Sequence, residues 1–348
     1  MRIAVLNNCV PFLYGGAEYL ADALARKFRE YGHESTVIKI PFRWDPPSSV
    51  LEQILAARLL RLPNTDLAVA FKFPAYYIPH PNKVLWLLHQ FRQAYDLWGT
   101  EFQSIPDTPG GRAVRDAIVR ADNAYLPEAR RIFTNSKVTG DRLRKFNGIE
   151  SEVLLPPLLS DAVYRGGETG DAIVALGRVN GAKRQLLLVQ AMKHCRTPVR
   201  LIVAGKSESP QYAAAIQAEI RKHRLADRVE FVDRFISDEE KIGFLSGSLA
   251  CAYIPYDEDS YGYVTLEACL SRKAVVTCSD SGGIEALVRP GETGLIAEPD
   301  PQALAAAFDE LHSDKGRATR MGAAGEELAK SLRINWDNVI RTLTGAAS

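Results

Sequence analysis

Two cations flank a short loop that contains glycine: Arg178 directly follows Gly177, and Lys183 comes five residues after Arg178. The preceding residues 172–176 form an apolar run typical of a buried strand. A guanidinium offers a planar fork of donors to phosphate oxygens, and a lysine ammonium is a mobile point charge. This arrangement suits a diphosphate, and a pair of solvated surface charges is the alternative interpretation.

A second polar segment, residues 254–268, contains the features of an anion site. A predicted strand ends near Pro255, and Gly262 leads into a predicted helix that begins with Tyr263 and Val264. Free backbone N–H groups and the dipole at the start of a helix attract anions, and glycine lets a ligand approach the backbone closely. We therefore expect phosphates to bind beside these first helical residues.

Two carboxylates lie on either side of this expected anion site. Asp259 precedes the helix, and Glu267 follows about one turn after its start. Carboxylates do not bind an anion, but they accept hydrogen bonds from hydroxyl groups. A ligand with phosphates in its middle and hydroxyl-rich groups at both ends meets both requirements, and a nucleotide sugar has this composition.

The segment Asp259–Glu267 resembles the Glu-x7-Glu motif of the family-four retaining glycosyltransferases, which have the GT-B fold. In that family the first carboxylate contacts the donor sugar and the second contacts the nucleotide ribose. Arg178 and Lys183 resemble the family's diphosphate clamp. The likeness covers most of the chain and is strongest over residues 172–300. Further similar segments are Gly15-Gly16-Ala17-Glu18, Phe133–Ser136, Leu155–Pro157, Ala274–Thr277, Ser281–Val288 and Gly291–Ile296.

The resemblance implies roles for particular residues. Arg178, Lys183, Asp259 and His89 are expected to be catalytic. The residues expected to bind the donor are Gly15, Gly16, Gly177, Phe235, Gly262, Tyr263, Val264 and Glu267.

The first carboxylate of the motif departs from the family, because Asp259 stands where glutamate is usual. The aspartate side chain is one methylene shorter. Either its loop moves inward or the neighbouring Glu258 takes the role of contacting the sugar.

Two single residues have open interpretations. His89 ends the apolar run 84–88, where it is expected either to contact the transferred sugar or to be a hydrogen-bonded structural histidine. Phe235 follows the predicted strand 229–232, and we expect it either to border the nucleobase or to have no role in binding.

The sequence allows two interpretations of the diphosphate site, one with a metal ion and one without. Residues 257–259 match a bare Asp-x-Asp, the metal motif of the other large glycosyltransferase fold. In the metal-free architecture, Arg178, Lys183 and helix N–H groups replace the charge of the cation. No His or Cys cluster has zinc spacing. We therefore expect neither a metal nor a cofactor.

Short apolar runs alternate with amphipathic stretches along the chain, a pattern that indicates βαβ units and parallel sheets. The expected fold is α/β: two facing, Rossmann-like, doubly wound domains of the GT-B type with a cleft between them. Residues 1–165 form the expected acceptor-side domain, and residues 166–330 the domain that binds the nucleotide sugar. Residues 158–170 are interpreted as a linker, and residues 331–348 as a helix that packs back on the first domain.

The charge distribution excludes a dedicated nucleic-acid binder, because the net charge is only +1. Residues 1–165 contain 21 Lys and Arg against 17 Asp and Glu, so their net charge is +4. Five cysteines without a C-x-x-C pair and no apolar run of membrane-spanning length predict a cytoplasmic protein. If the acceptor is lipid-linked, this surplus charge should draw the protein to the cytoplasmic face of a membrane as a peripheral protein.

The sequence therefore predicts a retaining, metal-independent glycosyltransferase of polysaccharide biosynthesis. It would transfer a hexose-type sugar from a UDP- or GDP-sugar to a hydroxyl of a glycan or glycolipid. Two alternatives remain: a nucleotide-sugar epimerase of the same architecture, and a nucleotide-binding protein without catalysis.

Overall fold

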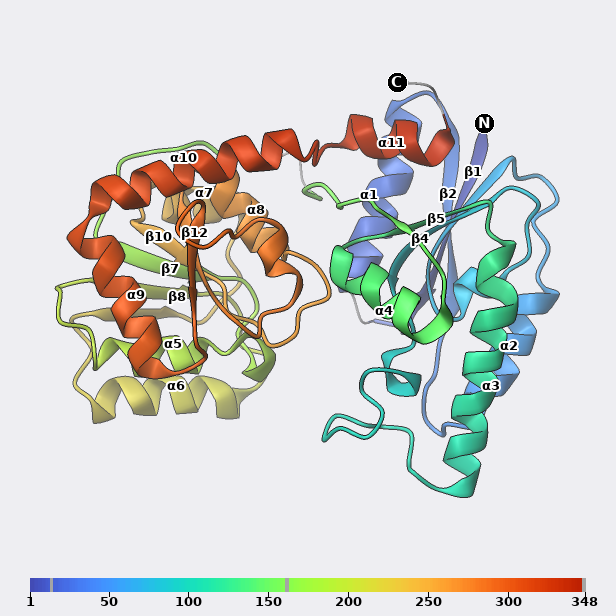
Figure 1. Cartoon of the computed structure of the whole chain (residues 1–348), viewed down its shortest axis with the longest axis horizontal. Coiled ribbons are helices and arrows are strands. Elements are labelled where there is room, and N and C mark those ends of the chain that lie inside the picture. The colour runs from blue at the N-terminus through green and yellow to red at the C-terminus, as the bar shows by residue number, and fades with distance from the viewer. Residues whose placement is uncertain (13–14, 160–162, 346–348) are drawn as a thin grey trace. The chain divides into compact units, whose positions relative to one another are not determined.

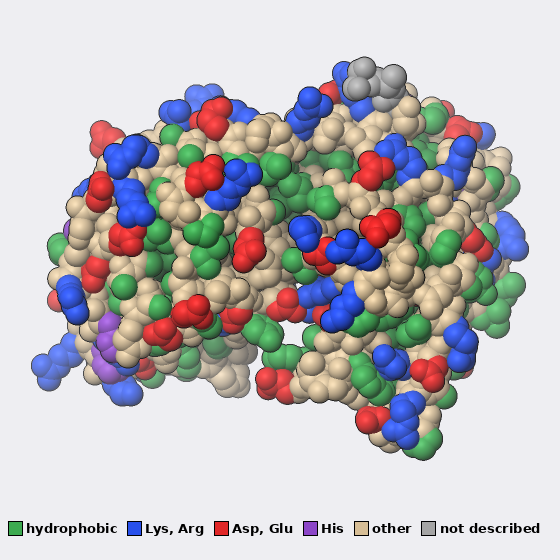
Figure 2. All heavy atoms as spheres, in the orientation of Figure 1, with side chains coloured by type: hydrophobic (Ala, Val, Ile, Leu, Met, Phe, Trp, Pro, Cys, Tyr) green, Lys and Arg blue, Asp and Glu red, His purple; other side chains and the backbone are tan. Residues whose placement is uncertain are grey.

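A computed structural model describes residues 1–12, 15–159 and 163–345 of the chain (Figure 1). The chain divides into two compact units. Unit 1 comprises Met1–Ser160 together with Ile334–Ser348, and unit 2 comprises Asp161–Arg333. On the face shown in Figure 2, acidic and basic side chains are interspersed over both units, in keeping with the net charge of +1.

Unit 1 contains a six-stranded parallel sheet in the order β2-β1-β3-β4-β5-β6. Its strands are β1 Arg2–Cys9, β2 Glu34–Pro41, β3 Leu67–Lys72, β4 Lys83–His89, β5 Arg131–Thr134 and β6 Glu152–Val153. Its α-helices are α1 Gly16–Glu30, α2 Ser49–Leu59, α3 Pro109–Tyr125, α4 Lys137–Asn147 and α11 Trp336–Thr344, and its 3-10 turns are η1 Ala75–Tyr77, η2 Arg92–Ala94 and η3 Leu126–Glu128.

The apolar run in β1 is buried on both faces of this sheet. Ile3 and Val5 pack in the core that lies under α1 and α11, whereas Ala4 and Leu6 pack in the core that contains Val50 of α2. Successive side chains of a strand point to opposite faces, so a strand covered on both faces needs an unbroken apolar run.

Unit 2 repeats the design with a six-stranded parallel sheet in the order β12-β11-β10-β7-β8-β9. The strands are β7 Ala172–Leu176, β8 Arg200–Ala204, β9 Val229–Val232, β10 Ala250–Ala252, β11 Ala274–Cys278 and β12 Gly294–Ala297. The α-helices are α5 Gln185–Met192, α6 Pro210–Lys222, α7 Asp238–Ser246, α8 Tyr263–Leu270, α9 Pro301–Ser313 and α10 Lys315–Ser331, and the 3-10 turns are η4 Gly181–Lys183 and η5 Gly283–Ala286.

The final helix returns to unit 1. Val339, Ile340 and Leu343 of α11 are buried in the core beside α1, where Figure 1 shows the two helices together. The Trp336 indole N–H donates to the carbonyl of Leu158 over 2.9 Å. The crossing between units therefore lies at Ile334, and α11 belongs to the packed structure of unit 1.

The glycine-rich segment interpreted from the sequence as a linker lies on unit 2 instead. A Cβ atom added to Gly167 would lie 2.7 Å from the carbonyl oxygen of Ser246, and one added to Gly170 would lie 2.2 Å from that of Gly247. Tyr164, just before these glycines, is also buried. These glycines are therefore needed for close packing, and the unit boundary lies before Asp161 rather than after residue 165.

Unit 1 encloses a carboxylate that has three phenols as its hydrogen-bond donors. Asp122 is 0% exposed, and its Oδ1 accepts from the hydroxyls of Tyr76 (2.9 Å) and Tyr77 (2.7 Å). Its Oδ2 accepts from the hydroxyl of Tyr95 over 2.6 Å. Burial raises the pKa of Asp122 to about 6, although the three hydrogen bonds oppose the shift.

We expect this carboxyl to make the stability of the protein depend on pH. The folded state holds the Asp122 proton more tightly than the unfolded state, so the free energy of unfolding should fall as the pH rises from about 4 to about 6. Relative to Asp122→Asn, which does not titrate, the wild type should lose about 2–3 kcal/mol over this window. Urea denaturation of both proteins at each pH measures the difference, and parallel pH profiles would contradict the expectation.

Candidate functional site

The candidate site of unit 2 lies where its strand order reverses direction. From β7 the chain adds β8 and β9 on one side, and then β10, β11 and β12 on the other. The loops that follow β7 and β10 therefore leave the sheet beside a crevice at the carboxyl ends of these strands. Ligands of doubly wound sheets bind at such a switch point.

The loop after β7 is shaped by a close approach of two backbones. Gly177 has φ +106°, and its N–H donates to the carbonyl of Ala204 over 3.0 Å. A Cβ added to Gly205 would lie 1.8 Å from the carbonyl oxygen of Gly177. The next residue, Arg178, has a side chain that is 65% exposed and donates to Oε1 of Glu208 over 2.8 Å. The guanidinium lies at this edge of the sheet and is held there by an acidic partner.

Lys183 lies just before the first α-helix that follows β7, rather than inside it. It ends η4, where its N–H donates to the side chain of Asn180 over 2.9 Å, and α5 begins only at Gln185. The reason is that Arg184 has a left-handed conformation with φ +55°. The Lys183 ammonium donates to the hydroxyl of Tyr253 over 2.8 Å and forms an ion pair with Glu258.

Arg184 is a site-building residue that sequence reasoning missed. Its guanidinium donates to both carboxylate oxygens of Asp280 (2.8 and 2.6 Å) and to the carbonyls of Ile254 (2.7 Å) and Pro255 (2.9 Å). These bonds tie the loop after β7 to the loops after β10 and β11. The only signal in the sequence was a second cation beside Lys183, which does not reveal partners 70 to 96 residues away.

Gly262 begins α8 in a conformation and a space that suit glycine. Its φ is +70°, and a Cβ on it would lie 2.2 Å from Cε1 of Tyr253. The first turn of α8, with Tyr263 and Val264, starts immediately after it, and a Cγ2 of Val264 lies 3.6 Å from the Cβ position of Gly177. The structure therefore brings the two predicted glycine turns and the start of α8 together.

The two candidate carboxylates for the sugar contact are placed differently. The loop that carries them is bonded on both sides of Gly282. The carbonyl of Glu258 accepts from the Gly283 N–H over 2.9 Å, and the N–H of Glu258 donates to the carbonyl of Ser281. The carboxylate of Glu258 contacts the Lys183 ammonium. Asp259, the next residue, is partly buried. The structure thus joins Glu258 to the clamp lysine, whereas the sugar contact of Asp259 stays a prediction.

Glu267 lies inside unit 2, on α8. It is 5% exposed, and its Oε1 accepts from the Lys241 ammonium over 3.0 Å. Among residues 1–12, 15–159 and 163–345, its buried Oε2 has no hydrogen-bond partner. Burial alone would lower the pKa of Lys241, but Glu267 and Asp238 raise it above its usual value. Lys241 therefore remains charged beside Glu267, a pairing that sequence spacing did not reveal.

The remaining predicted residues are more peripheral or belong to unit 1. Phe235 is 78% exposed in the segment after β9. Gly15 caps α1, and its N–H donates to the Glu18 carboxylate over 2.8 Å, with Gly16 as the first helical residue. His89 ends β4 with its Nδ1 2.6 Å from the carbonyl oxygen of Gln90. Gly15, Gly16 and His89 all lie at the carboxyl edge of the sheet of unit 1.

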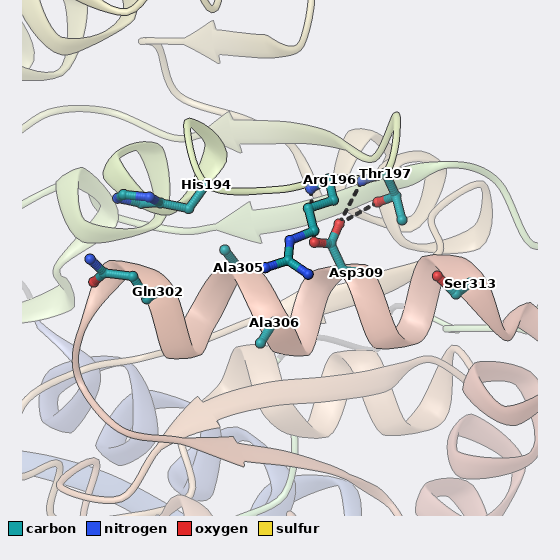
Figure 3. A pocket seen from close by; sticks show the side chains of 8 residues that line it. All are labelled: His194, Arg196, Thr197, Gln302, Ala305, Ala306, Asp309 and Ser313. Atoms are coloured by element: carbon teal, nitrogen blue, oxygen red, sulfur yellow. Dashed lines mark hydrogen bonds between the residues drawn. The ribbon is translucent and has the colours of Figure 1, made fainter.

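A separate pocket of about 490 Å³ lies beside α9, lined on one side by His194, Arg196 and Thr197 (Figure 3). Asp309 of α9 accepts from the N–H groups of Arg196 and Thr197, both over 2.8 Å. Residues 194–197 precede β8, so this pocket lies at the amino edge of the sheet, opposite the candidate site. Its carboxylate is already used to hold the loop.

The described residues form neither a metal-binding cluster nor a membrane-spanning helix. In ranges 1–12, 15–159 and 163–345, no group of three or more His, Cys, Asp and Glu side chains is arranged to hold a metal ion. None of the described helices combines the length and the apolar character needed to cross a membrane.

Comparisons of the sequence with known proteins identify glycosyltransferases as similar proteins. Residues 162–328 match the family described as "Glycosyl transferases group 1". A D-inositol 3-phosphate glycosyltransferase of Acidothermus cellulolyticus is 24% identical over 95% of this chain and 85% of its own length. Sucrose-phosphate synthase from Thermosynechococcus elongatus has a similar fold, with a TM-score of 0.74, 19% identity and coverage of 99% and 100% of the two chains. The Anabaena protein Alr3699/HepE in complex with UDP has a TM-score of 0.75, 18% identity and the same coverage.

These comparisons confirm the expected fold class of two parallel, doubly wound sheets of the GT-B type. They also confirm the resemblance to group 1 glycosyltransferases that the motifs indicated. The epimerase alternative finds no support in them.

Proposed function

We propose that this chain, whose residues 162–328 match the group 1 glycosyltransferases, transfers a hexose-type sugar from a UDP- or GDP-sugar to a hydroxyl of a glycan or glycolipid. The observation that carries the proposal is the convergence of Lys183 and the start of α8 at the switch point of unit 2. A relative of similar fold is in complex with UDP, which supports a nucleotide donor.

On the basis of these contacts, we assign a part of the donor to each group of side chains. The diphosphate would bind between Lys183, Arg178 and the N–H groups that open α8, where cations and a helix dipole favour negative charge. The ribose hydroxyls would donate to Glu267, which also accepts from the Lys241 ammonium. The sugar would contact the loop of Glu258 and Asp259. Gly15, Gly16, His89 and Phe235 keep their predicted roles in this proposal.

Retention of the anomeric configuration would follow from attack on the same face as the departing diphosphate. A double displacement needs a carboxylate nucleophile below the sugar ring, and the sequence identifies none. In the proposed step the acceptor oxygen bonds to the anomeric carbon, the bond from that carbon to the diphosphate breaks, and the diphosphate takes the acceptor's proton. The protein positions the reactants and stabilises charge on the leaving group.

A donor panel tests the function. The protein is incubated with UDP- and GDP-sugars, first without and then with glycan and glycolipid acceptors, and the released nucleotide and the anomeric configuration of the product are measured. Transfer with retention supports the proposal. Tight binding of a donor with no transfer to any acceptor would favour the nucleotide-binding protein without catalysis.

We expect the transfer to be independent of divalent metal, because Arg178, Lys183 and helix N–H groups supply the positive charge at the diphosphate. EDTA should leave the rate of donor hydrolysis or transfer unchanged. The measurement is the initial rate before and after chelation, with added manganese as the control. Loss of activity with EDTA and its return with manganese would instead support a metal at residues 257–259.

A glycolipid acceptor would place the protein at a membrane surface. Leu51, Leu55 and Leu59 are spaced by four residues on α2 and are 39%, 60% and 67% exposed, so they form an apolar stripe beside the exposed Arg61. In the proposed membrane contact this stripe would supply the apolar area, and Arg61 would supply the charge.

We expect the wild type to co-sediment with anionic vesicles at low salt, and Leu55→Glu to weaken this binding several-fold because it puts a charge into the stripe. High salt should release the protein, since part of the attraction is electrostatic. Ala56→Glu, which adds the same charge at an exposed position of α2 outside the stripe, is the matched control. A wild type that stays in the supernatant at low salt would argue against peripheral association.

A further inference from the structure

Tyr253 lies at the centre of the proposed diphosphate site, and neither motif includes it. Its backbone is fixed by β11, because its N–H donates to the carbonyl of Val276 (3.0 Å) and its carbonyl accepts from the Thr277 hydroxyl (2.8 Å). Its ring covers the beginning of α8: a Cβ on Gly262 would lie 2.2 Å from Cε1 and 3.0 Å from the hydroxyl. The phenol is therefore held directly beside the helix start where phosphates are expected.

The hydrogen bonds of this phenol leave its proton directed at an acidic group. The Tyr253 oxygen accepts from the Lys183 ammonium over 2.8 Å, and its hydroxyl donates to Oε2 of Glu258 over 3.4 Å. The ammonium also lies 5.2 Å from the centroid of the Tyr253 ring. Burial, and then the Glu258 charge, raise the pKa of Tyr253 well above its usual value. The phenol therefore stays protonated and available as a donor.

Glu258 accepts the hydrogen bonds of both Lys183 and Tyr253. Its Oε2 is the shared acceptor of the Lys183 ammonium and the Tyr253 hydroxyl. The side chains of Lys183 and Glu258 are 18% and 26% exposed, so the pair is partly shielded from water. A diphosphate that reaches Lys183 must compete with this carboxylate, because like charges repel at such a distance.

We propose that Tyr253 is a third diphosphate-binding group of this site, and that Glu258 is a counter-ion which the diphosphate of the donor replaces. This inference rests on the proposed function, because it needs a diphosphate ligand. In the empty site the phenol and the ammonium both bind Glu258. In the occupied site both bind a phosphate oxygen, and the Glu258 side chain turns away.

The test compares ligands that differ only in their phosphates. Isothermal titration calorimetry measures the binding of uridine, UMP and UDP, and of guanosine, GMP and GDP, to the wild type, Tyr253→Phe, Glu258→Gln and Lys183→Ala. Tyr253→Phe keeps the ring over Gly262 and removes only the hydroxyl. Tyr256→Phe, the same change on an exposed ring in the same loop, is the matched control.

We expect Tyr253→Phe to weaken binding of the diphosphate about tenfold to a hundredfold, which is the usual effect of removing a hydrogen bond to a charged group. Nucleoside binding should be unchanged, which a change in folding would not leave intact. Glu258→Gln should bind the diphosphate several-fold more tightly, since no carboxylate competes for the ammonium. These ligands lack the transferred sugar of the donor, so a contact between Glu258 and that sugar does not enter the result.

The outcomes separate the two levels of the proposal. If the wild type binds neither UDP nor GDP, the proposed function fails. If the wild type binds one of them and Lys183→Ala weakens it, but Tyr253→Phe binds as the wild type does, the role of Tyr253 is wrong. If Glu258→Gln binds the diphosphate no more tightly than the wild type, Glu258 is not a counter-ion that the ligand replaces.

Discussion

Replacing Lys183 by alanine should lower sugar transfer by at least about a hundredfold, because a preorganised charge at a developing anion contributes roughly 2.7–4 kcal/mol to the transition state. The ammonium is held at the carboxyl edge of unit 2 by Tyr253 and Glu258, and no other lysine in the described parts of the chain contacts either residue. The loss should appear mainly in kcat, since charge on the diphosphate grows as the bond to the sugar breaks.

Initial rates with a saturating donor measure this effect. Lys222→Ala is the matched control, because Lys222 is exposed at the end of α6. Binding of the free nucleoside should be unchanged in Lys183→Ala, since the proposed partner of the ammonium is the diphosphate, which the nucleoside lacks. A variant that loses nucleoside binding to the same extent as diphosphate binding would place Lys183 elsewhere in the site.

Replacing Glu267 by glutamine should weaken nucleoside, nucleotide and donor alike, by about tenfold to a hundredfold, because hydrogen bonds to a charged group contribute roughly 1.5–3 kcal/mol. The proposed partner is the ribose, which all three ligands share. Glutamine keeps the size of the buried side chain, and Lys241 keeps its ion pair with Asp238. This pattern is the opposite of that expected for Lys183, where the loss depends on the phosphates.

Calorimetric titration with the nucleoside and its mono- and diphosphates measures the pattern. Glu219→Gln is the control, because Glu219 is also a largely buried, ion-paired carboxylate of unit 2, on α6. Circular dichroism shows whether loss of the pair with Lys241 disturbs the fold. If Glu267→Gln lowers only the binding of the diphosphate, the ribose assignment is wrong.

The layout of the sheets could be predicted from the sequence because their signals are local. The unbroken apolar run 84–88 favours a strand that is covered on both faces, and β4 spans Lys83–His89. The turn at Gly262 before a helix also follows from local sequence. In contrast, helices α2 and α3 were not predicted, because residues 40–130 resemble the glycosyltransferase family only weakly.

Details of the site depended on contacts between distant segments. Helix α5 begins only at Gln185, because the preceding Arg184 has a left-handed conformation. In this conformation Arg184 binds Asp280 and two carbonyls far along the chain. Glycines 166–170, which resemble a flexible linker in composition, are close-packed against unit 2. Composition reports the freedom of a glycine but not the atoms that surround it.

The sequence by itself determined the kind of chemistry: cations, a glycine-led helix and carboxylates in an order that suits a nucleotide sugar, on alternating strands and helices. Only the tertiary structure decided which groups meet. Glu258, rather than Asp259, contacts Lys183, and Tyr253 joins them at the start of α8. The physical reason is that residue types and spacing set what a side chain can do, whereas Lys183 and Glu258, 75 residues apart, meet only when β7 and β10 pair in the sheet.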